Sequence, residues 1–171
     1  MDAINARISR GEKLLDAWDA WALRKQQWFE RLAQAEFHTF DMRFDTHCIL
    51  GRLYKKYSRG LRRLKIPCTE AHWYGFATGK PSEYTTLTKI WRERTYARLK
   101  EKIDLLISPF GCEVTGFAPF SVGEQGDNRV YQPGVYVRFP TSMRTEQRGE
   151  IATQITNKIK GVTRVFTEVE T

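Results

Sequence analysis

Apolar residues recur at helical spacing through the first third of the chain. Their separations of three, four and seven residues place five of them on one stripe of a helix: Leu14, Trp18, Trp21, Trp28 and Leu32. Just before them, Ser9-Arg10-Gly11-Glu12 has capping-box spacing, in which a serine hydroxyl and a glutamate carboxylate each accept from an amide at a helix start. The pattern predicts a helix over residues 12–35.

A second helical stripe follows without any proline or glycine between Glu12 and Leu50 to mark a break. Its apolar positions run up to Ile66-Pro67 and are Leu50, Tyr54, Tyr57, Leu61 and Leu64. One very long helix or a two-helix hairpin turning near residues 37–39 fits this pattern. The hairpin is favoured, because a lone helix of that length would leave aromatic side chains in water.

The pattern changes after Pro67 and alternates between short extended segments and helices. Phe and Val alternation predicts strands, while the serines and the glycine mark helix ends. The predicted elements are a strand at 71–77, a helix from Ser82 to Ser108-Pro109, strands at 112–122 and 135–139, a helix from Ser142 to Gly161, and a strand at 162–169.

This order is β-α-β-β-α-β, which is the ferredoxin-like order of an α+β fold. The sequence therefore predicts an α+β protein in two parts. Residues 1–67 form a helical region, and residues 68–171 form a ferredoxin-like domain. With 41% apolar residues, ten Phe, seven Tyr and five Trp, the chain of 171 residues has enough large side chains to fill a core.

The first residues lack the apolar run of a signal peptide, and no segment approaches the ~20 apolar residues of a membrane span. Cys48, Cys68 and Cys112 are odd in number and widely spaced, which favours free thiols in a reducing compartment. We therefore expect a cytoplasmic protein with no membrane partner.

Charge changes this picture, because the excess of +8 is concentrated near the N-terminus. Residues 1–65 hold 14 Lys and Arg against 8 Asp and Glu, whereas residues 111–171 hold 7 against 7. Residues 52–65 contain seven basic residues and no acidic one. On a continuous helix, six of them would share the face opposite the apolar stripe: Arg52, Lys55, Lys56, Arg59, Arg62 and Arg63.

We call these six residues the basic stripe. Like charges at helical spacing repel one another, so the stripe is more easily understood if an anion binds there, and phosphate is the commonest such anion. A solvated helix face, an acidic protein partner or a membrane surface are the alternatives. The absence of any compensating glutamate favours the anion over the solvated face.

A second candidate surface lies on the predicted strand at 135–139. If Val135, Val137 and Phe139 face the helices, Tyr136 and Arg138 point outward, near Phe117. An exposed aromatic residue and an arginine on an open sheet can stack and hold bases. The segment resembles the glycine-aromatic strand of RNA-recognition domains, although the second aromatic residue and the basic residue before the glycine are missing.

Metal and catalytic patterns are weak. His47-Cys48 and Cys68 with His72 match no established zinc spacing, so no metal or cofactor is expected. His38, Asp41 and Asp45 fall on one helical face, and His38-Thr39-Phe40 resembles one half of the paired motif of two-histidine phosphoesterases. The second half of that motif is absent, and a solvated acidic face is the simpler interpretation.

Three functional hypotheses follow. The first is a non-enzymatic protein that binds DNA or RNA, gripping phosphates through the basic stripe, with Tyr136 and Arg138 as further contacts. The second is an assembly, structural or inhibitor protein, in a viral or other multi-subunit particle, that binds a partner or itself through Trp18, Trp21 and Trp28. The third is a small nuclease or phosphoesterase.

Overall fold

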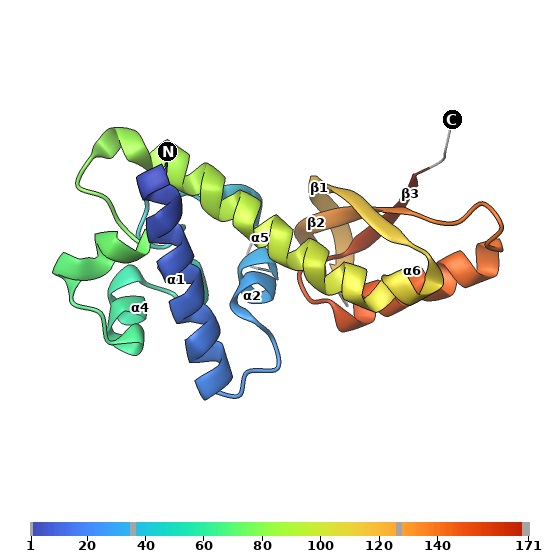
Figure 1. The fold of residues 1–171 in the computed structure, drawn as a ribbon, viewed down its shortest axis with the longest axis horizontal. Helices are drawn as coiled ribbons and strands as arrows, with labels where there is room; N and C mark the ends of the chain where they lie inside the picture. Colours follow the sequence, from blue (N-terminus) through green and yellow to red (C-terminus); the bar gives the residue numbers. More distant parts are fainter. Residues whose placement is uncertain (1, 35–36, 126–127, 169–171) are drawn as a thin grey trace. The chain divides into compact units, whose positions relative to one another are not determined.

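The computed structural model describes residues 2–34, 37–125 and 128–168 (Figure 1). Its α-helices are α1 (Asp2–Trp21), α2 (Trp28–Gln34), α3 (Ile49–Tyr54), α4 (Tyr57–Leu64), α5 (Tyr84–Ile107) and α6 (Thr145–Lys158). The 3₁₀ helices are η1 (Phe37–Thr39), η2 (Cys68–Tyr74), η3 (Pro81–Glu83) and η4 (Ser108–Phe110), and the strands are β1 (Glu113–Gln125), β2 (Asn128–Arg138) and β3 (Arg164–Glu168).

By packing, the chain divides into two compact units. The first comprises residues 1–28 and 39–94, and the second comprises residues 29–38 and 95–171. The first half of helix α5, up to Arg94, belongs to the first unit, and its second half, from Thr95, belongs to the second. The expected boundary at residue 67 falls inside the first unit.

The predicted helix over 12–35 starts too late and is interrupted, because this part of the chain forms the two helices α1 and α2. Helix α1 begins by Asp2 and ends at Trp21, because the chain turns at Leu23, whose φ is 50°. Asp19 and Asp16 then accept hydrogen bonds from the backbone N and the ring Nε1 of Trp28, at 2.5 and 2.9 Å. These two carboxylates anchor the start of α2, so a tertiary contact separates the two helices.

Neither the long helix nor the two-helix hairpin is present, since α3, α4 and η2 follow α2 before α5 begins. The strand predicted at 71–77 is wrong as well, because residues 68–74 form the 3₁₀ helix η2. Its aromatic pattern serves side-chain packing instead. Phe76 is buried and stacks on Trp91 at 5.8 Å between ring centroids, and the chain turns at Gly75, whose φ is 66°.

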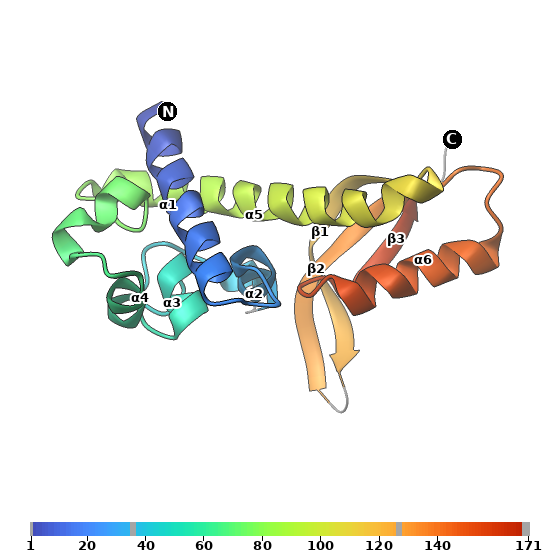
Figure 2. The ribbon, with the colours of Figure 1, turned by 60° about the horizontal axis from the view of Figure 1, so that its bottom comes forward.

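The second unit holds a three-stranded sheet in the order β1-β2-β3 (Figures 1 and 2). Strands β1 and β2 pair antiparallel, and β2 pairs parallel with β3 after the crossover through α6. One face of the sheet is covered by the second half of α5 and by α6, and both the helices and the sheet contribute buried side chains to the core between them. These side chains include Leu99, Ile103, Val135, Val137 and Ile155.

The predicted helices and strands of this unit are confirmed, although β2 begins at Asn128, well before the predicted strand at 135–139. Helix α5 stops at Ile107, before Pro109, and α6 begins at Thr145 rather than just after Ser142. Gly161 has the left-handed φ of 91° expected after α6. The α+β class is therefore confirmed, but the first strand of the ferredoxin-like order is missing, and the described order from residue 84 is α-β-β-α-β.

The three cysteines are free thiols, as predicted. Every helix of the described segments is too short or too polar to cross a bilayer.

Candidate nucleic-acid interface

The basic stripe does not lie on one helix. Lys55 adopts a left-handed conformation with φ of 70°, which ends α3, and Lys56 is the extended N-cap residue of α4. The prediction that six cations share one helical face is therefore wrong. The break leaves both lysines exposed in the turn between the helices.

The packing of α3 against α4 explains this turn. Gly60 of α4 lies so close to α3 that a Cβ atom added there would stand 2.7 Å from the Cβ of Leu50 and 3.0 Å from the Tyr54 ring. Leu61 and Leu64 are buried on the same side. A continuous helix would hold these surfaces apart, so their burial drives the chain to fold back on itself.

With its apolar side buried, α4 presents Arg59, Arg62 and Arg63 to solvent. Their spacing of three and four residues gathers them on one face of a single helix, where they line an open hollow of about 530 Å³. Within the part of the chain that the structure describes, no carboxylate forms an ion pair with any of the three. We call these three residues the arginine hollow.

Arg52 has a different role from the other members of the stripe. It is half-buried, and its guanidinium donates a hydrogen bond to the hydroxyl of Thr39, which ties α3 to the end of η1. This arginine is a structural residue of the first unit. The spacing between Arg52 and Arg59 does not place their side chains on a common helical face, because the two residues are on different helices.

The excess charge of the chain lies entirely in the unit that carries the arginine hollow. The first unit has seventeen Lys and Arg against nine Asp and Glu, whereas the second has eleven against eleven. Many of the other cations of the first unit have acidic partners, such as Arg7 with Glu83 at 2.8 Å and Arg94 with Glu12 at 3.4 Å. By contrast, the cations of the α3–α4 turn and of α4 form no ion pair among the described residues.

Tyr136 and Arg138 belong to the second unit, on the outward face of β2, as the alternation predicted. The neighbouring ring is not Phe117, which stacks on Tyr96 at 4.9 Å, but Phe166 of β3, at 5.1 Å from Tyr136. Arg138 forms ion pairs with Glu113 at 3.2 Å and Glu168 at 3.6 Å. These glutamates neutralise the cation that was expected to contact nucleic acid beside Tyr136.

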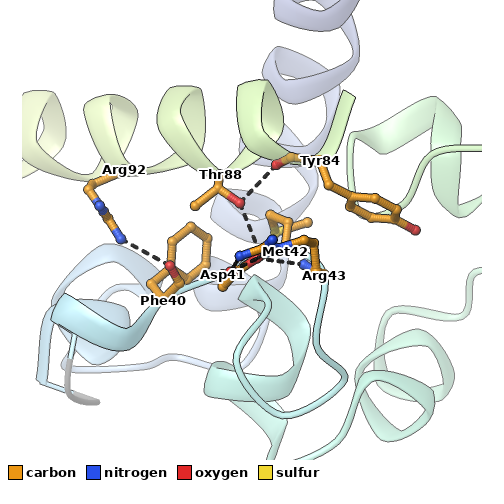
Figure 3. A network of polar contacts seen from close by, with 7 residues as sticks. All are labelled: Phe40, Asp41, Met42, Arg43, Tyr84, Thr88 and Arg92. Atoms are coloured by element: carbon orange, nitrogen blue, oxygen red, sulfur yellow. Dashed lines mark hydrogen bonds and ion pairs between the residues drawn. The ribbon is translucent and has the colours of Figure 1, made fainter. Parts of the chain in front are cut away.

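The segment that leads into α3 is fixed by a polar network from α5 (Figure 3). The Arg92 guanidinium donates to the Phe40 carbonyl at 2.9 Å, and the backbone N of Met42 donates to the Thr88 hydroxyl at 3.0 Å. Arg43 donates to the Asp41 carboxylate, and this hydrogen bond lowers the pKa of Asp41 below its usual value. Asp41 is therefore held as a carboxylate, which disfavours a role as a proton donor.

The remaining catalytic candidates do not share the predicted helical face. His38 lies in the 3₁₀ helix η1, whereas Asp41 and Asp45 lie in the non-helical segment between η1 and α3. Cys48 caps α3 by accepting from the backbone N of Gly51 at 3.3 Å, and burial raises its pKa, which keeps the thiol protonated. Among the described residues, no three His, Cys, Asp or Glu side chains gather where they could hold a metal ion.

A cluster of aromatic and basic residues in the first unit was not predicted. Trp73 of η2 is 55% exposed, His72 lies against it at 4.7 Å between ring centroids, and the Arg10 guanidinium lies over its ring at 6.0 Å. The sequence signal was present in His72-Trp73-Tyr74 but was interpreted as a strand. In that interpretation the contact with Arg10 of α1 could not be foreseen.

Comparisons with known proteins add no relative. No family model matches the chain, and a search among curated proteins finds no significant match.

Proposed function

We propose that the protein binds nucleic acid without catalysing a reaction on it, and that it grips phosphates through the arginine hollow with little base specificity. The observation that carries this proposal is that Arg59, Arg62 and Arg63 are exposed on one helix face without an acidic partner among the described residues. The planar fork of a guanidinium matches a pair of phosphate oxygens. Bound phosphates would also relieve the repulsion between like charges at this spacing.

The charge distribution supports the same proposal. A polyanion is attracted by the net positive charge of a whole surface as well as by the individual Lys and Arg side chains that contact its phosphates. The first unit supplies that surface, with Lys55 and Lys56 exposed in the turn beside α4 and Lys65 exposed just after it. The neutral second unit and the paired Arg138 do not contribute to the net attraction.

The test is a charge reversal with a matched control. Arg59→Glu with Arg62→Glu should abolish most binding to labelled DNA and RNA at low salt, while Lys158→Glu with Lys160→Glu changes the net charge equally on the neutral unit and should reduce binding far less. Circular dichroism should show unchanged folding, because all four side chains are exposed. An equal loss of binding in both variants would mean that only the net charge of the protein matters, and it would refute the proposal that the arginine hollow grips phosphates.

A second candidate function is assembly through the end of α1. Trp21 is 74% exposed and Leu23 is 88% exposed, and the Trp21 ring lies 4.8 Å from that of Trp18. Trp28 is fully buried and therefore no longer belongs to such a surface. Light scattering on the same samples separates the two candidates, since a monomer that binds nucleic acid argues against self-assembly, and an oligomer that binds none argues for it.

A further inference from the structure

We infer that Trp73 is a stacking platform for an unpaired base, so that the nucleic acid bound by this protein is single-stranded. This inference rests on the proposed function and names its substrate class. It starts from the exposure of Trp73, which keeps 55% of its surface in contact with solvent, whereas Trp28 and Trp91 of the same unit are fully buried. An exposed indole ring next to cations is the feature that sequence-tolerant single-strand binders use.

The ring is held in place by its surroundings. Arg10 of α1 donates a hydrogen bond from Nε to the Trp73 carbonyl at 2.8 Å, and its guanidinium lies over the Trp73 ring. The His72 ring lies against the same indole, tilted by 38°. A side chain fixed in this way loses little conformational entropy when a second ring stacks on it, which favours binding.

The backbone that carries Trp73 is equally well fixed. At Gly11, a Cβ atom would stand 2.3 Å from the Tyr74 carbonyl oxygen, so α1 and η2 meet backbone to backbone at a position that only glycine permits. The ring Nε1 of Trp91 donates to the Gly75 carbonyl at 2.8 Å. The end of helix η2, directly after Trp73, is thereby anchored to both α1 and α5.

The platform belongs to the same unit as the arginine hollow. Helix η2 packs against α4 and against α1, and Figures 1 and 2 both place this green segment beside α4. Arg10 adds a cation next to the ring, where a backbone phosphate would follow a stacked base. The arrangement offers one surface for a base and another for phosphates, and the first is inaccessible to a base that is stacked and paired within a duplex.

The experiment compares Trp73→Leu with Trp21→Leu, which removes another exposed tryptophan from the same unit. Binding is measured by fluorescence anisotropy to three labelled probes. They are a single-stranded oligothymidine of about 12 nucleotides, within the site sizes of single-strand binders, its duplex with oligoadenosine, and an abasic backbone of the same length and charge.

Trp73→Leu should weaken binding to the single strand on the order of tenfold and leave binding to the duplex and the abasic backbone unchanged. Trp21→Leu should behave as wild type, and Trp73→Phe should retain most of the affinity, because a phenyl ring also stacks. Equal affinity of wild type and Trp73→Leu for the single strand would refute the platform while leaving the phosphate grip intact. If the wild type binds none of the probes at low salt, both proposals fail.

Discussion

Neutralising the arginine hollow should change how binding depends on salt, and the size of the change follows from the number of cations that touch phosphate. The perturbation is the triple variant Arg59→Gln, Arg62→Gln, Arg63→Gln. Glutamine has a helix propensity close to that of arginine, so α4 should persist. The three side chains are exposed and form no ion pair with a described carboxylate, so the free energy of unfolding should change by less than about 0.5 kcal/mol per site.

The magnitude comes from counterion release. For a single strand the slope of log K against log salt is about −0.7 for each neutralised phosphate, so three arginines contribute about −2.1. Between about 50 and 200 mM salt, their contacts should then weaken binding roughly twentyfold. If Lys55, Lys56 and Lys65 also reach phosphates, the wild-type slope approaches about −4.2, and the loss over the same range is roughly three-hundredfold.

The assay is anisotropy with a labelled single strand at four or more salt concentrations, for the wild type and the triple variant. The variant should show a slope less steep by about 2.1, together with weaker binding at the lowest salt. A variant that binds more weakly but keeps the wild-type slope would mean that the arginines do not contact phosphates. The Lys158→Glu, Lys160→Glu variant provides the reference for a change in net charge alone.

Two further predictions concern stability and thiol chemistry. Gly60→Ala places a Cβ 2.7 Å from the nearest side chain of α3 and should lower the free energy of unfolding by about 1–3 kcal/mol. Gly149→Ala on α6, where no atom lies within 4 Å, should instead raise the free energy of unfolding by about 0.4–1 kcal/mol. A shift of the unfolding temperature in the same direction for both variants would contradict this packing. Cys68 should react with a thiol reagent in the native protein at about pH 8, while Cys48 and Cys112, whose pKa values are raised by burial, should react only after unfolding. Native-state labelling of Cys48 at the rate of Cys68, followed by mass spectrometry, would show that the burial of Cys48 is not maintained in solution.

The C-terminal part of the fold was predictable because its elements carry local signals. Helix α5 is bounded by Ser82 and Pro109, α6 is followed by Gly161, and the strands alternate apolar and polar residues. Each of these signals acts within a few residues of the element it defines. The helices and strands therefore appear where the sequence pattern placed them, within a few residues at their ends except at the start of β2, which is Asn128 and not Val135.

The N-terminal part was not predictable, because its helix ends are set by packing and hydrogen bonds between neighbouring helices and not by residues within the same helix. Helix α2 starts where Asp19 accepts from the backbone N of Trp28, and α3 ends at Lys55 so that Gly60 can pack on Leu50. Neither lysine nor leucine favours a left-handed conformation, so nothing local marks the turns at Lys55 and Leu23. The helical periodicity was correct for each short helix and misleading only across the breaks.

The break between α3 and α4 also determines which residues of the basic stripe share a face. Arg59, Arg62 and Arg63 keep their predicted common face because α4 is continuous across them, whereas Arg52 lies before the break and binds Thr39. A grip of three arginines would weaken steeply with salt, so the proposed binding at physiological ionic strength would need a further contribution that salt does not screen. Stacking on an aromatic ring is such a contribution, at about 1–3 kcal/mol per base. If the protein binds a single strand as proposed, the arginine hollow should contribute to the salt slope, and Trp73 should contribute to the affinity that remains at high salt.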